Sequence, residues 1–178
     1  LGGLVADEFD VTTCQEMLVD HALTLPMALL WPGGGDWPVR IVPIAMNHVQ
    51  HPLPSPRRAY RLGQSVGRAL AAWAGDARVV VIGTGGLSHQ LEGERAGFIN
   101  KAFDLQFLQS METNPEWATQ FTDLELVEKA GTQGVELLMW LAMRAALTAA
   151  GSGVRKVHSN YHIPISNTAT GVLALETV

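Results

Sequence analysis

One histidine follows an expected strand, at a position where open α/β sheets bind ligands. His89 lies in the glycine-rich turn 83–90, GTGGLSHQ, which directly follows the apolar run 79–82. Because that run has no polar alternation, we expect a strand covered on both faces, and ligands gather at the carboxyl ends of such strands. A histidine there can exchange a proton near neutral pH. A histidine that only hydrogen-bonds within its own loop fits the sequence as well.

A single carboxylate interrupts an apolar helical pattern. Glu136 is the only charged residue in the segment 135–143, VELLMWLAM. A helix that is apolar on nearly all sides is buried, and a buried carboxylate must be paired, protonated or bound to a metal. The alternative is a carboxylate in the first helical turn, where the positive helix end stabilises it and water reaches it. Spacing by itself favours this alternative.

The remaining histidines predict no site from their spacing. His21 fits an ordinary helix residue. His48 and His51 imitate a metal-binding pair, but they lie beside prolines without helical context and are interpreted as loop residues. His158 and His162 would face the same side of a strand, where polar surface residues are expected.

Composition excludes several classes of function. The 178 residues carry 12 basic and 17 acidic side chains, a net charge of -5, with no basic run of the kind that binds nucleic acid. Cys14 is the only cysteine, which excludes an intrachain disulfide framework and fits a cytoplasmic location. No signal-peptide pattern or apolar run of about 18 residues occurs, so we expect no membrane partner. The turn 83–86 lacks the P-loop pattern for nucleotide phosphates.

The elements that would hold these residues alternate between strands and helices. Strands are expected over 39–46, 79–82, 154–161 and 172–178, and helices over 14–22, 56–74, 99–111, 124–130 and 132–150. This alternation predicts a single α/β domain over 1–178 with a mostly parallel central sheet flanked by helices. Gly63 and Gly67, four residues apart, would let the helix 56–74 pack closely against that sheet.

Several separate motifs, in this order, resemble the class III extradiol ring-cleaving dioxygenases. They are Asp20-His21 with Thr24 and Pro26, the turn 83–90, the segment 93–101 (GERAGFINK), and Gly134-Val135-Glu136 with 139–141. The similarity spans nearly the whole chain and implies the C-terminal part of the family's catalytic α/β domain. Within the family, members that open gallate are the most similar, followed by members that open protocatechuate.

The resemblance implies a non-haem Fe(II) enzyme that uses O2 to cleave a carboxylated catechol or pyrogallol ring beside its hydroxyl pair. Glu136 matches the family's glutamate ligand, and His89, 47 residues earlier, matches its catalytic base. His21 matches a histidine that contacts the bound substrate. Ser166-Asn167-Thr168 resembles the part that binds the substrate carboxylate. Gallate is the first expected substrate and protocatechuate the second.

The family's two histidine ligands of iron have no counterpart in this chain. We therefore expect them in an N-terminal part of the same polypeptide, which this chain lacks. The family also covers its site with a small helical lid, which predicts an oligomer with a lid subunit or a fused lid domain. The alternative is a non-enzymatic relative of the same fold that keeps the crevice for binding or scaffolding. Histidines upstream would favour the enzyme.

Overall fold

The computed structural model describes residues 1–48 and 50–178. The chain divides into two compact units, one made of Leu1–Val11 with Asn47–Val178 and the other of Thr12–Met46. None of the helices in the described ranges is both long and apolar enough to cross a membrane. The single catalytic domain expected over 1–178 stays a prediction.

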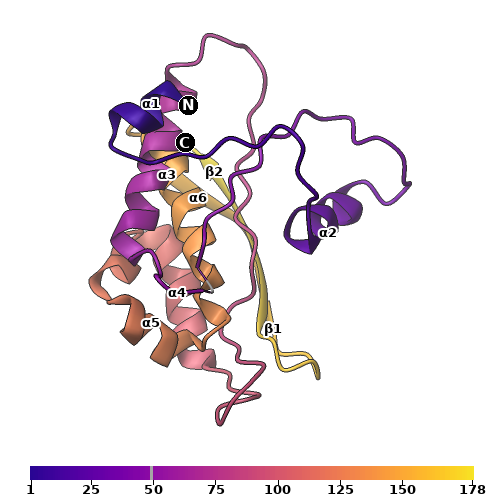
Figure 1. Cartoon of the computed structure of the whole chain (residues 1–178), viewed down its shortest axis with the longest axis vertical. Coiled ribbons are helices and arrows are strands. Elements are labelled where there is room, and N and C mark those ends of the chain that lie inside the picture. Colours follow the sequence, from indigo (N-terminus) through magenta and orange to yellow (C-terminus); the bar gives the residue numbers. More distant parts are fainter. Residues whose placement is uncertain (49) are drawn as a thin grey trace. The chain divides into compact units, whose positions relative to one another are not determined.

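The larger unit is built around two helices that pack against each other, α3 (Pro56–Ala71) and α6 (Leu138–Thr148) (Figure 1). A Cβ atom added to Gly63 would lie 2.1 Å from the carbonyl oxygen of Ala142, and one added to Gly67 would lie 2.3 Å from that of Ala146. Only glycine permits so close an approach of two backbones. The close packing predicted at these glycines is therefore present, but its partner is a helix and not a sheet.

Shorter helices complete the helical part of this unit: α1 (Gly2–Ala6), α4 (Lys101–Thr113), η1 (Trp117–Gln120), α5 (Asp123–Ala130) and η2 (Gly134–Leu137). The Asn100 side chain caps α4 by accepting from the backbone N–H of Phe103 at 3.2 Å. Thr122 and Glu125 form a capping box at the start of α5. Core side chains come from α4, α5 and α6, among other elements, and include Phe103, Phe107, Met111, Leu126 and Leu141.

Two strands, β1 (Val154–His162) and β2 (Thr170–Thr177), pair in antiparallel fashion. The register runs from Val154 opposite Thr177 to His162 opposite Thr170, with an irregularity between Lys156 and His158. The strands expected over 154–161 and 172–178 are thus confirmed. The connection between them, residues 163–169, contains the segment 166–168 that was expected to bind substrate.

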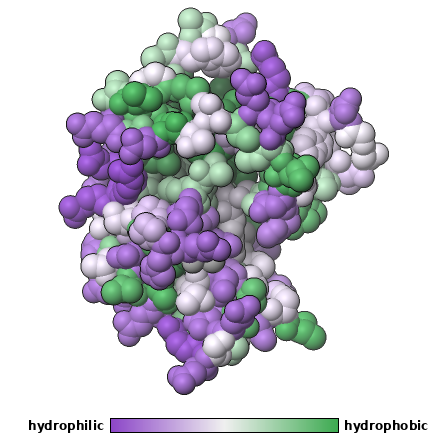
Figure 2. Space-filling view, viewed as in Figure 1, coloured by the Kyte–Doolittle hydropathy of each residue, from purple (hydrophilic) through white to green (hydrophobic). Residues whose placement is uncertain are grey.

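A mostly parallel central sheet is absent from the part of the chain that the structure describes. Residues 39–46 and 79–82, expected as strands, form no ladder (Figure 1). Val42 is 85% exposed and Val80 is 72% exposed, so neither segment is covered on both faces. A parallel strand needs a neighbour for its backbone groups, and the described residues supply none to these two segments. Figure 2 shows hydrophobic areas between hydrophilic ones on one face of the molecule.

Several helix boundaries differ from those predicted. In the smaller unit, α2 (His21–Leu30) begins where the predicted helix 14–22 was to end, because Asp20 caps it by accepting from the Ala22 N–H at 2.9 Å. In the larger unit, the predicted helix 132–150 is split into η2 and α6. Trp73, which lies within the predicted helix 56–74, is beyond the end of α3 and is 50% exposed.

Candidate functional site

The glycine-rich turn lies beside the segment 166–169. The Leu87 N–H donates to the Ala169 carbonyl oxygen at 2.9 Å, and the Ala169 N–H donates to the Ser88 carbonyl oxygen at 3.2 Å. His89 and Thr168 form an isolated antiparallel bridge. Two segments about eighty residues apart in sequence are therefore held side by side by main-chain hydrogen bonds, as in a short piece of sheet.

The backbone of His89 is also held from the side of α5. Its N–H donates to the Ala130 carbonyl oxygen at 2.8 Å, and its carbonyl oxygen accepts from the Gly134 N–H at 3.2 Å. A Cβ atom on Gly131, whose φ is +90°, would lie 2.2 Å from the His89 carbonyl oxygen. The end of α5 and the start of η2 thus enclose the histidine backbone.

The ring of His89 has one nitrogen engaged. The side chain is 5% exposed, and Nδ1 lies 2.9 Å from the Leu87 carbonyl oxygen. A carbonyl oxygen only accepts, so in the neutral ring the hydrogen lies on Nδ1 and Nε2 carries the lone pair. Nε2 is therefore the nitrogen that can take up a proton.

Glu136 lies directly against the same turn. Its Oε2 accepts from the Gly86 N–H at 3.0 Å, and a Cβ atom on Gly85 would lie 2.6 Å from the Glu136 Cβ. The indole N–H of Trp140 donates to the Gly85 carbonyl oxygen at 3.2 Å. Glu136 is half-buried in η2, just before α6, so both features weighed from the sequence, an early helical position and partial burial, are present.

His48 lies near Glu136, which spacing did not indicate. The Nε2 atom of His48 is buried and has no hydrogen-bond partner among the described residues. Burial lowers the pKa of His48, and the negative charge of Glu136 acts in the opposite direction. His158 and His162 are exposed, as expected for surface residues, and His51, interpreted as a loop residue, is exposed in a bend.

The segment 166–168 contributes unevenly to the site. Thr168 is half-buried. A Cβ atom added to Gly86 would lie 3.0 Å from Thr168 Cγ2 and 3.0 Å from His89 Cε1, so both side chains lie against this glycine. Ser166 and Asn167 are exposed. Within the described ranges, neither the Ser166 nor the Thr168 hydroxyl makes a hydrogen bond, so both remain available to a ligand.

A buried carboxylate that sequence reasoning missed supports the turn. Asp104 in α4 is 0% exposed and accepts from the Ser88 N–H at 2.9 Å, the Ser88 hydroxyl at 2.6 Å and the Tyr161 hydroxyl at 2.8 Å. Burial raises the pKa of Asp104, whereas these bonds and the charge of His89 lower it. Asp104 is three residues from Phe107 and seven from Met111, so it is a charged residue on the apolar face of α4. This spacing is the sequence signal from which a buried carboxylate could have been predicted.

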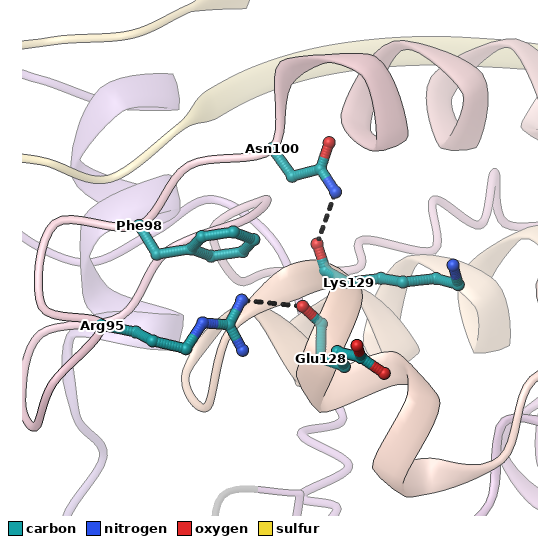
Figure 3. A pocket seen from close by; sticks show the side chains of 5 residues that line it. All are labelled: Arg95, Phe98, Asn100, Glu128 and Lys129. Carbon is teal, nitrogen blue, oxygen red and sulfur yellow. Dashed lines mark hydrogen bonds between the residues drawn. The ribbon is translucent and has the colours of Figure 1, made fainter.

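Arg95, Phe98, Asn100, Glu128 and Lys129 line a surface pocket that contains neither His89 nor Glu136 (Figure 3). The Arg95 guanidinium carbon lies 3.9 Å from the Phe98 ring centroid, and the guanidinium donates to the Glu128 carbonyl oxygen at 2.7 Å. The Asn100 amide donates to the Lys129 carbonyl oxygen at 3.1 Å (Figure 3). These bonds tie the loop after the turn to the end of α5, so we assign the pocket a supporting role.

His21 is the first residue of α2 and belongs to the smaller unit. Its contact with a substrate stays a prediction.

A family model described as the catalytic LigB subunit of aromatic ring-opening dioxygenase matches residues 2–171. The chain belongs to the LigB family. The LigB chain is similar to gallate dioxygenase of Pseudomonas putida KT2440. The two are 40% identical over 173 residues, which cover 97% of this chain and 50% of the relative.

Two further relatives have lower identities to this chain. A 2,3-dihydroxyphenylpropionate/2,3-dihydroxicinnamic acid 1,2-dioxygenase of Xanthobacter autotrophicus is 29% identical over 208 residues, covering 92% of this chain and 65% of the relative. The enzyme of that name from Rhodococcus jostii RHA1 is 30% identical over 192 residues, covering 83% and 60%. The chain thus spans about half to two thirds of the length of these relatives.

The residues that the structure describes could supply one ligand of a metal ion but not a complete set of ligands. Glu136 offers a carboxylate whose Oε1 takes no hydrogen bond from the described residues. Over 1–48 and 50–178, no group of three His, Cys, Asp or Glu side chains is arranged to hold a metal. A ferrous site of two histidines and one carboxylate would therefore need ligands from outside these residues.

Proposed function

We propose that the protein to which this chain belongs is an Fe(II)-dependent extradiol dioxygenase that opens a carboxylated catechol or pyrogallol ring with O2. The observation that supports it best is the meeting of His89, Glu136 and Thr168 at one glycine turn in a LigB-family chain. Gallate is the first substrate and protocatechuate the second. The three named relatives support a carboxylated substrate, because each acts on an aromatic acid.

In this proposal His89 is the general base. The chemistry that Fe(II) supplies when bound is electron transfer between a dihydroxylated ring and O2. For that transfer the ring must lose its hydroxyl protons, and Nε2 of His89 is the nitrogen free to take one. The hydrogen bond from Nδ1 to the Leu87 carbonyl holds the ring orientation while the proton moves.

Glu136 is proposed as the carboxylate ligand of iron. The Gly86 N–H binds Oε2 and so fixes the orientation of the carboxylate, while Oε1 remains available to a cation. A metal ion would also offset the cost of holding a charged group in a half-buried position.

Thr168, Ser166 and Asn167 are proposed to bind the substrate carboxylate, and His21 to contact a ring hydroxyl. Thr168 has the strongest support, because it pairs with His89 and its hydroxyl is uncommitted among the described residues. A hydroxyl hydrogen bond to a carboxylate is charge-assisted, so it contributes to affinity as well as to orientation.

The remaining parts of the proposal concern the intact protein. We infer that two histidine ligands and a small helical lid come from other parts of the polypeptide or from a second subunit. A cytoplasmic location accords with Cys14, which is a free and exposed thiol.

Oxygen uptake by the intact, Fe(II)-loaded protein tests the proposal. Gallate, protocatechuate, 2,3-dihydroxyphenylpropionate and uncarboxylated catechol are compared under one set of conditions. We expect uptake with ring opening for gallate and a slower reaction for catechol. Binding of these compounds without uptake, at full iron content, would instead support the non-enzymatic alternative.

A further inference from the structure

We propose that Asp104 is a positioning residue that holds the turn carrying His89 in its reactive place, acting through Ser88 and Tyr161. The inference rests on the proposed role of His89 as a base. Asp104 is a fully buried carboxylate on α4.

The contacts of Asp104 converge on the residue next to His89. Ser88 donates twice, from its N–H to Oδ1 at 2.9 Å and from its hydroxyl to Oδ2 at 2.6 Å. Two bonds to one residue restrain both its backbone and its side chain. Because Asp104 and Ser88 are both 0% exposed, water cannot replace either bond.

Ser88 is held from a second direction by the start of α4. Its hydroxyl accepts from the Asn100 N–H at 2.7 Å while donating to Asp104. Both partners of this hydroxyl thus lie at the beginning of one helix. The turn can move relative to α4 only if these buried bonds break, which is a demanding requirement in a low-dielectric interior.

Tyr161 extends the same network to the substrate segment. Its hydroxyl donates to Oδ2 of Asp104 at 2.8 Å, the oxygen that also accepts from Ser88. Tyr161 lies at the end of β1, just before the connection 163–169. One carboxylate therefore joins α4, the turn with the proposed base, and the strand that leads to Thr168.

The geometry gives this network a catalytic consequence. His89 follows Ser88 directly, so a shift of Ser88 displaces Nε2 relative to the ring that it must deprotonate. Misplacement of a catalytic group by about 1 Å costs on the order of 10² in rate. Loss of the network should therefore lower kcat more than it weakens substrate binding.

Asp104→Asn in the intact, Fe(II)-loaded protein tests the role. An amide keeps the shape but has one acceptor oxygen, so it cannot accept from Ser88 and Tyr161 as two carboxylate oxygens do. We expect kcat to fall by roughly 10- to 100-fold, with KM within about threefold and iron content unchanged. Ser110→Ala is the matched control, since Ser110 lies on the same helix, is buried, and donates only to the Phe107 carbonyl at 2.7 Å.

Backbone amide exchange gives a readout that does not depend on turnover. In Asp104→Asn, exchange over residues 83–90 should rise, whereas exchange over α3 and α6 should match the wild type. Tyr161→Phe removes one donor and keeps the ring, so it should give the same pattern with a smaller effect. It also serves as the second variant if Asp104→Asn does not fold.

The outcomes separate the two proposals. If the wild type takes up no oxygen with any substrate, the proposed function fails, and the exchange data still decide whether Asp104 holds the turn. Wild-type exchange over 83–90 in both variants would overturn the positioning role. An equal fall of kcat in Ser110→Ala and Asp104→Asn would overturn it as well, because general destabilisation would then explain the loss.

Discussion

At the scale of single residues, His89 is restrained through every group except one ring nitrogen. Its N–H, its carbonyl oxygen and its Nδ1 atom all have main-chain partners. The proposed base, held in this way, loses little entropy when it meets a substrate, which is how preorganised groups contribute to rate. The free Nε2 atom is therefore the position where a substitution should affect chemistry without affecting the surrounding structure.

His89→Asn should remove turnover while leaving iron and substrate in place. The asparagine amide can still donate to the Leu87 carbonyl, but it has no basic nitrogen. Loss of a general base costs on the order of 10² to 10⁴ in rate. Anaerobic substrate titration, iron analysis and oxygen uptake together check this expectation. A variant with near wild-type kcat would show that His89 is not the base.

Glu136→Gln should abolish iron retention in the intact protein and leave its fold unchanged. The amide keeps the shape and can still accept from the Gly86 N–H, but it lacks the negative charge that a cation requires. Iron content after desalting is the measurement, with circular dichroism as the check on folding. One equivalent of Fe(II) in the variant would contradict the ligand assignment.

Thr168→Ala should raise KM for a carboxylated substrate by roughly tenfold, about 1.4 kcal/mol, with a smaller effect on kcat. Ser166→Ala provides the comparison, because Ser166 is exposed and Thr168 is paired with His89. Steady-state kinetics with gallate and with uncarboxylated catechol measure the difference. If Thr168→Ala affects both compounds equally, this residue does not bind the carboxylate.

At the scale of elements, the end of α5 and the start of η2 determine where the turn lies. Gly131 ends α5 and approaches the His89 carbonyl more closely than any other residue type permits. The predicted helix 132–150 does not start at Thr132. The segment first passes along the turn as η2, and the regular helix begins only at Leu138.

Gly131→Ala should destabilise the protein by about 2–5 kcal/mol, because it combines an unfavourable φ with a clash against the His89 carbonyl. Gly151→Ala is a matched control. Gly151 has a similar φ of +84° but no atom within 4 Å of an added Cβ, so only the conformational cost of about 1–2 kcal/mol applies. Urea unfolding of the intact protein measures both, and equal losses would show that the approach to His89 contributes nothing.

At the scale of the whole molecule, the site is incomplete within the described residues. They offer Glu136 as a ligand and no group of three metal-binding side chains. The family's relatives are longer, since this chain covers 50% of the Pseudomonas putida gallate dioxygenase. Iron binding and substrate turnover are consequently properties that we assign to the intact protein.

The 178-residue chain, expressed alone, should therefore retain far less than one equivalent of Fe(II). One carboxylate cannot hold a ferrous ion against dilution, because three protein ligands are the usual minimum for this kind of centre. Metal analysis after desalting under anaerobic conditions checks this. Stoichiometric iron in the isolated chain would mean that it contains a complete ligand set.

The local parts of the fold were predictable from the sequence. The helix α3, the two strands β1 and β2, and the position of α4 follow from periodicity and from end signals such as Ser55-Pro56 and Asn100. These features depend on residues within a few positions of each other. Even so, a helix was predicted over 14–22, whereas the regular helix α2 begins only after Asp20, whose side chain caps it.

Which distant segments meet became clear only from the folded chain. The motifs around His89 and Glu136 indicated the LigB family from the sequence, but not that Gly86 binds Glu136 or that Asp104 binds Ser88. Nor did hydrophobicity reveal that residues 79–82 would lack a strand partner. An apolar run or a buried charge indicates that a partner is needed. Which residue is that partner depends on contacts between segments far apart in the chain.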